Sequence, residues 1–65
     1  MVKKGDRYHR LTGDEAVVME VRDNGYVWLK VHWAGTSHWF ESHYPPGKIE
    51  TEGGWIPNGP TQREP

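Results

Sequence analysis

The sequence predicts a small all-β domain, an antiparallel barrel of four to five strands. Three observations support this prediction: apolar residues alternate with a period of two, Gly, Asn and Pro separate the alternating runs, and helical periodicity never exceeds one turn. With 65 residues and no cysteine, the chain forms one domain near the lower size limit for folding without a disulfide. Four tryptophans compensate for this small size, because each aromatic side chain buries roughly 150–250 Å².

The first strand is expected over residues 6–12, and the turn cluster Thr12-Gly13-Asp14 ends it. The central hairpin is expected over 15–22 and 26–33, around the loop Asp23-Asn24-Gly25. The glycine can supply left-handed backbone at a bulge, which makes a three-residue loop.

This loop pairs Arg22 with Tyr26 and sets the register of both strands. A two-residue loop mixes polar and apolar residues on each face, so the alternation favours the longer loop. The expected inward pairs are Val21 with Val27, Met19 with Leu29, and Val17 with Val31.

A turn at 34–37 leads to a fourth strand over 38–42. The Tyr44-Pro45-Pro46-Gly47 segment ends it, because proline cannot donate a ladder hydrogen bond. A short fifth strand is expected at 48–50, and residues 55–57 are expected to dock on the sheet.

Gly, Pro, Gln and charged residues dominate from Asn58. The sequence therefore predicts a barrel over 1–57 and a flexible tail over 58–65.

The number and length of these strands and their short connections favour an SH3-like five-stranded barrel. A five-stranded oligonucleotide-binding barrel needs more chain, and the prolines and glycines of 43–65 disfavour a C-terminal helix. The predicted core comprises Leu11, Val17, Met19, Val21, Val27, Leu29, Val31, Trp33 and Phe40, with Ile49 and Ile56 closing one end.

The opposite face of the predicted sheet carries rings and cations. A tight turn at Gly35-Thr36 pairs His32 with Trp39, Lys30 with Glu41, and Val31 with Phe40. We predict that this face binds a protein partner, since ring contacts contribute roughly 1–3 kcal/mol each. Two structural alternatives stay open: the rings only stabilise the sheet, by roughly 0.2–1 kcal/mol per pair, or residues 55–57 cover them. The predicted partner-binding residues are Tyr26, Trp28, His32, Trp39, Lys30 and Arg22.

The main alternative function is nucleic-acid binding by the same rings. The net charge of −1 argues against it, because dedicated nucleic-acid binders of this size are usually basic. A more distant alternative is a homo-oligomeric enzyme with a site between subunits. The basic residues of the nucleic-acid alternative are Lys3, Lys4, Arg10, Lys30 and Arg22.

Catalytic and metal-binding signatures are weak, so we expect no enzyme activity and no cofactor. The four histidines lack both a helical i,i+4 pair and cysteine support, which argues against zinc. Ser37 and Ser42 each precede a histidine, but neighbouring strand residues point to opposite faces. Signal-peptide and membrane-spanning patterns are also lacking, so we expect a soluble cytoplasmic protein.

Residues 26–35, Tyr26-Val27-Trp28-Leu29-Lys30-Val31-His32-Trp33-Ala34-Gly35, followed by Trp39, resemble the central strands of chromo-barrel and Tudor-like domains. The matching positions are Tyr26, Trp33 and Trp39. This resemblance implies an SH3-like barrel that binds modified or cationic peptides through aromatic side chains.

The opening Gly5-Asp6-Arg7-Tyr8 is similar to the first strand of many SH3-like barrels. The short chain, its tryptophan content and this opening also resemble small barrel proteins of actinobacterial bacteriophages. That resemblance implies an accessory protein that binds a host factor.

Overall fold

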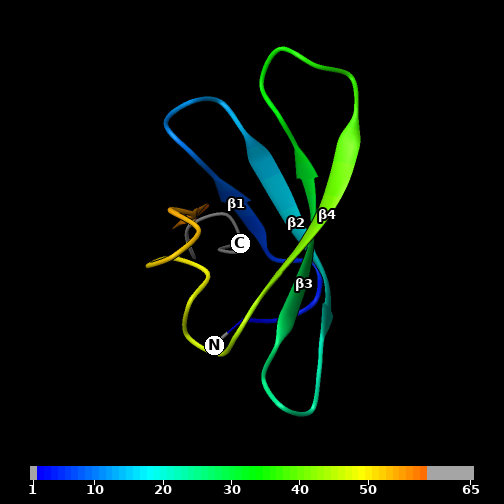
Figure 1. Ribbon diagram of the computed structural model, residues 1–65, viewed down its shortest axis with the longest axis vertical. Helices are drawn as coiled ribbons and strands as arrows, with labels where there is room; N and C mark the ends of the chain where they lie inside the picture. Colours follow the sequence, from blue (N-terminus) through cyan, green and yellow to red (C-terminus); the bar gives the residue numbers. More distant parts are fainter. Residues whose placement is uncertain (1, 59–65) are drawn as a thin grey trace, which may run out of the picture.

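In the computed structural model, which describes residues 2–58, five strands form one antiparallel sheet without a helix among those residues. The strand order is β4-β3-β2-β1-β5, so the last strand returns to lie beside the first (Figure 1). The all-β class is confirmed, and the sheet stays open because β4 and β5 form its two edges. The strands are β1 (Arg7–His9), β2 (Glu15–Val21), β3 (Val27–His32), β4 (Trp39–Tyr44) and β5 (Ile56–Pro57).

The central hairpin has the predicted three-residue loop. The backbone N–H of Arg22 donates to the carbonyl of Tyr26 at 2.8 Å, and Gly25 adopts a φ of 90°. Val21 pairs with Val27, which confirms the register next to the loop. The left-handed glycine lets the chain reverse while both strands keep their ladder.

A β-bulge at Met19 changes the register of β2 farther from the loop. Glu20 pairs with Trp28 and Val18 with Leu29, so Met19 is the extra residue between them. The extra residue displaces every earlier residue of β2 by one pairing position. Because side chains alternate along a strand, each of these residues moves to the opposite face of the sheet. The predicted pairings of Met19 with Leu29 and of Val17 with Val31 are therefore wrong; Val17 pairs with Lys30 and Ala16 with Val31.

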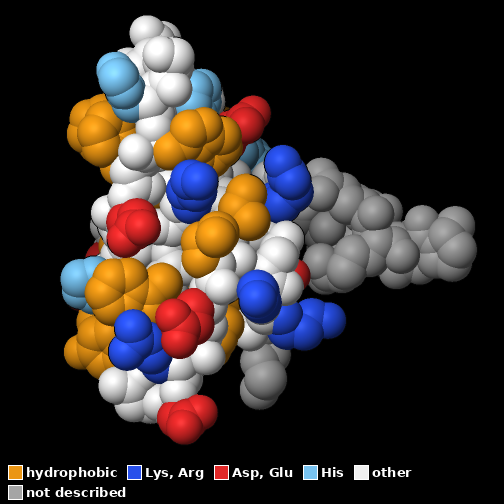
Figure 2. Space-filling view, turned by 90° about the vertical axis from the view of Figure 1, so that its right-hand side faces the viewer, with side chains coloured by type: hydrophobic (Ala, Val, Ile, Leu, Met, Phe, Trp, Pro, Cys, Tyr) orange, Lys and Arg blue, Asp and Glu red, His pale blue; other side chains and the backbone are white. Residues whose placement is uncertain are grey.

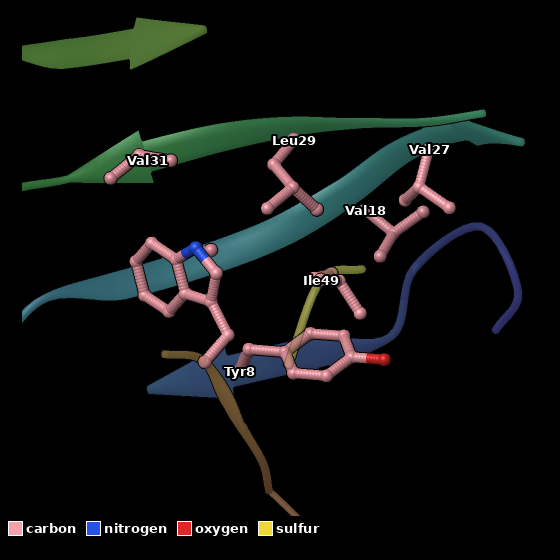
Figure 3. Close-up of a cluster of buried hydrophobic side chains, with 8 residues drawn as sticks. Tyr8, Val18, Val27, Leu29, Val31 and Ile49 are labelled. Atoms are coloured by element: carbon pink, nitrogen blue, oxygen red, sulfur yellow. The ribbon is translucent and has the colours of Figure 1, made fainter. Parts of the chain in front are cut away.

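The buried core lies on one face of the sheet. Side chains of β2 and β3 project toward Tyr8 and Ile49 (Figure 3). Of the predicted core, Val27, Leu29, Val31 and Ile49 are confirmed. The buried hydrophobic side chains of residues 2–58 are Tyr8, Ala16, Val18, Val27, Leu29, Val31, Ile49 and Trp55.

The other predicted core positions are wrong, for three physical reasons. The bulge turns Val17, which is half-buried, and Met19 away from the core face. Leu11 is 91 % exposed because the chain turns at residues 11–13, one residue beyond the end of β1. Val21, Phe40 and Ile56 are exposed at strand ends or edges, and Trp33 is exposed in the β3–β4 turn.

The segment that follows β4 closes the core. Residues 48–50, predicted as a strand, instead belong to a series of turns in which the N–H of Glu52 donates to the carbonyl of Lys48 at 2.9 Å. These turns bring the indole of Trp55 into the core, where its Nε1–H donates to the hydroxyl of Tyr44 at 3.1 Å. Trp55 thus covers the sheet from the side opposite the predicted rings.

Asp14 ties the two turns at one end of the sheet together. Its carboxylate accepts hydrogen bonds from the N–H of Ala34 at 2.8 Å, from Thr12 at 3.1 Å and from Arg10 at 3.2 Å. The Ala34 bond, with smaller contributions from Arg10 and Thr12, lowers the pKa of Asp14. The ionised carboxylate therefore stabilises this end of the sheet.

Candidate binding surface on the outer face

The face of the sheet opposite the core, here called the outer face, is built from three rows of directly paired residues. Paired residues of an antiparallel sheet share a face, so each row crosses several strands side by side. The upper row is Ile56, His9, Glu15, His32 and Trp39; the middle row is Arg7, Val17, Lys30 and Glu41; the lower row is Glu20, Trp28 and His43.

The pairing of β3 with β4 agrees with the sequence prediction. His32 pairs with Trp39, Lys30 with Glu41, and Val31 with Phe40. Because the side chains of β3 alternate, Tyr26, Trp28, Lys30 and His32 all belong to the outer face. Arg22, whose guanidinium lies over the ring of Trp28, joins them.

The lower row holds a cluster of stacked rings. The rings of Trp28 and His43 stack with 4.5 Å between their centroids, and Tyr26 lies 6.4 Å from His43. The guanidinium of Arg22 lies 5.0 Å from the Trp28 ring and pairs with Glu20 at 3.3 Å. These contacts leave Trp28 half-buried and Tyr26 37 % exposed.

His43 was not among the predicted site residues. It follows Trp39 and Glu41 at intervals of two residues along one strand, so the alternation that puts Trp39 on the outer face also puts His43 there. The sequence prediction ended the fourth strand at residue 42, which left this histidine outside the sheet.

The upper row borders a cleft of about 340 Å³. The ring of Trp39 lies on one side of it, 5.0 Å from the ring of His32 and 5.7 Å from the ammonium of Lys30. Arg7 and His9 also line the cleft. Trp39 remains 47 % exposed, so its ring is available for contacts.

Residues 55–57 do not cover the rings. Trp55 is buried in the core on the opposite side, and the Ile56–Pro57 strand pairs with β1 at the edge of the sheet. Figure 2 shows the outer face, on which hydrophobic side chains are interleaved with Lys, Arg, Asp and Glu. Aromatic rings and charges of both signs therefore share this face of the sheet.

Histidines and carboxylates also meet in the upper row, where Glu15 lies between His9 and His32. Across residues 2–58, however, no group of three or more potential ligands has a geometry that could hold a metal ion. The Nδ1 atom of His9 is instead 2.7 Å from the side-chain oxygen of Asn58, the first residue of the predicted tail. The rest of that tail, 59–65, lies outside the described residues.

Comparison of the chain with protein-family models, with curated proteins and with solved structures finds no match. Among the described residues, no helix has the length and apolar character needed to span a bilayer.

Proposed function

We propose that this chain is a non-enzymatic binding module that contacts a protein partner through the outer face. One observation carries the proposal: four rings that the sequence predicts as a site share a face that the core does not use. Trp55 already closes the core on the other face, so the core does not need these rings for cover. Large rings left on the open side can instead bury surface against a partner.

The charge pattern favours a protein partner over a nucleic acid. Positive Arg7, Arg22 and Lys30 lie next to negative Glu20 and Glu41 on the same face. A phosphate backbone is bound best by a surface of one sign. Arg10, which the nucleic-acid alternative requires, is engaged on the core side with Trp55.

We further propose that the sheet is a variant of the SH3-like barrel. The return of β5 to the side of β1 and the sequential order of the other strands support this class. An accessory role for a bacteriophage protein that binds a host factor in the cytoplasm rests on the sequence resemblance alone.

The chain offers two matched tryptophans for a test. Trp39 and Trp33 are 47 % and 50 % exposed and stand at the same end of the β3–β4 hairpin. Trp39 belongs to the outer face, whereas Trp33 contacts Phe40, which pairs with core residue Val31. The immobilised protein is used to capture partners from nuclease-treated lysate, with Trp39→Ala and Trp33→Ala beside the wild type.

The proposal predicts a protein that is retained by the wild type and by Trp33→Ala and is lost with Trp39→Ala. Retention should change little with added salt, because ring contacts release few counterions. Loss with Trp33→Ala but not Trp39→Ala would place the binding face on the core side. Capture that disappears on nuclease treatment would favour nucleic acid.

A further inference from the structure

The two edges of the sheet differ in their capacity to pair with another strand. The β5 edge has two residues, and one of them is Pro57, which has no N–H to donate. The β4 edge has six residues, contains neither proline nor lysine, and has β3 as its neighbour in the sheet. Natural edge strands are usually protected by proline or charged residues, and Glu41 is the single acidic residue of β4, so this edge is less protected than the β5 edge.

The hydrogen-bond pattern identifies the backbone groups that β4 presents outward. Tyr26 accepts a hydrogen bond from the N–H of Arg22, so the backbone groups of Tyr26 point toward β2. Those of Trp28, Lys30 and His32, which follow at intervals of two residues, point the same way. Val27, Leu29 and Val31 therefore direct theirs toward β4, where they pair with Tyr44, Ser42 and Phe40. The outward N–H and C=O groups of β4 belong to Trp39, Glu41 and His43.

Self-pairing of β4 around a two-fold axis has two registers of greatest overlap. An axis at Glu41 places this residue opposite Glu41 of the second copy, and like charges in that position are destabilising. An axis at Ser42 places Glu41 opposite His43 of the second copy and Phe40 opposite its Tyr44. The second register thus joins an acid to an imidazole and a ring to a ring, each of them twice.

We infer that β4 pairs antiparallel with β4 of a second copy of this chain, with Ser42 on the two-fold axis. The pairing covers part of Phe40, which is 42 % exposed in the single chain. It also places Trp39 opposite Pro45 of the second copy. The two sheets become continuous, and their outer faces lie side by side. This inference does not depend on the proposed function of the outer face.

The sequence contains no cysteine, so single cysteines can report the register without background. Ser42 and its copy form a non-hydrogen-bonded pair, for which the Cα separation is about 4.5 Å and within the disulfide range of about 4.4–6.8 Å. Ser42→Cys should therefore crosslink under mild oxidation. Glu41→Cys and His43→Cys are the matched controls, since neither residue lies opposite itself in this register.

Light scattering of the unmodified chain should give twice the 7.5 kDa of a single chain. Glu41→Lys should weaken the dimer on the order of tenfold, and adding His43→Glu should restore it, because the double variant places opposite charges across the two-fold axis. Circular dichroism confirms that each variant is folded. The inference is overturned if the chain keeps the mass of a single chain at protein concentrations up to about 1 mM, or if Glu41→Cys crosslinks in place of Ser42→Cys.

Discussion

The guanidinium of Arg10 lies over the indole ring of Trp55, with 3.9 Å between Cζ and the ring centroid. Its Nε and Nη2 groups also donate to the carbonyl of Gly53 at 2.9 and 2.6 Å. Arg10 follows β1 directly, whereas Trp55 follows the turns that close the core. One side chain therefore fastens the last part of the described chain to the first strand.

Replacing Arg10 with lysine should lower the free energy of unfolding by about 1–2 kcal/mol, because a lysine keeps the charge but loses the planar fork. Urea denaturation followed by tryptophan fluorescence measures the change. Arg7→Lys is the matched control: Arg7 is exposed on β1, so its replacement should cost less than about 0.5 kcal/mol. Equal losses for the two variants would contradict the role assigned to Arg10.

The Asp14 carboxylate gives the protein a predicted sensitivity to acid. The pKa of Asp14 is below its ordinary value of 3.8 in the folded protein, so the unfolded chain takes up the proton first. The stabilisation is complete above that value and is lost as the pH falls through the lower folded pKa. We expect stability measured from about pH 6 to about pH 2 to fall less steeply for Asp14→Asn than for the wild type. Asp23→Asn, in the exposed hairpin loop, controls for the loss of one negative charge, and a fall for Asp14→Asn as steep as that of the wild type would contradict the role of Asp14.

The bulge predicts opposite outcomes for two neighbouring valines. Val18 is 1 % exposed in the core, so Val18→Glu buries an unpaired carboxylate and should prevent folding. Val17 lies on the outer face between Arg7 and Lys30, so Val17→Glu should change stability by less than about 1 kcal/mol. Thermal unfolding by circular dichroism distinguishes the two variants. Folded Val18→Glu with unfolded Val17→Glu would show that the register of β2 is unbulged.

The hairpin loop packs against the residues after β4. A Cβ atom on Gly25 would lie 2.7 Å from Cγ of Pro46, whereas one on Gly35 would meet open space. Both glycines have positive φ, so Gly35→Ala measures the backbone strain alone. Gly25→Ala should cost about 1 kcal/mol more than Gly35→Ala, by urea denaturation. This excess should shrink in a Pro46→Ala background; an unchanged excess would argue against the contact.

The parts of the fold that the sequence predicted correctly depend on local signals. Asp23-Asn24-Gly25 specifies a three-residue loop, and the alternation of β3 leaves one choice for its buried face. The requirement that the Glu41 carboxylate stay out of the core then fixed the pairing of Lys30 with Glu41. The face that carries Tyr26, Trp28, His32 and Trp39 follows from these elements, which is why the bulge in β2 does not disturb it.

The bulge itself had no unambiguous signal. Ala16 and Val18 form one apolar alternation in β2, and Val17, Met19 and Val21 form another, so period alone cannot choose between them. The choice depends on tertiary packing, because only one set meets Tyr8 and Trp55. Trp33 and Phe40 were predicted as buried but are exposed. Their burial depends on how far the segment after β4 extends over the sheet, and strand alternation does not specify that extent.

The central claim is that Trp55 closes the core while the ring of Trp39 faces solvent. NMR of the four indole N–H groups in the presence of a soluble paramagnetic probe tests it most directly. We predict that the Trp39 signal broadens strongly and that the Trp55 signal, from an N–H bonded to Tyr44, stays sharp. A broadened Trp55 signal beside a protected Trp39 signal would contradict this arrangement of the two faces.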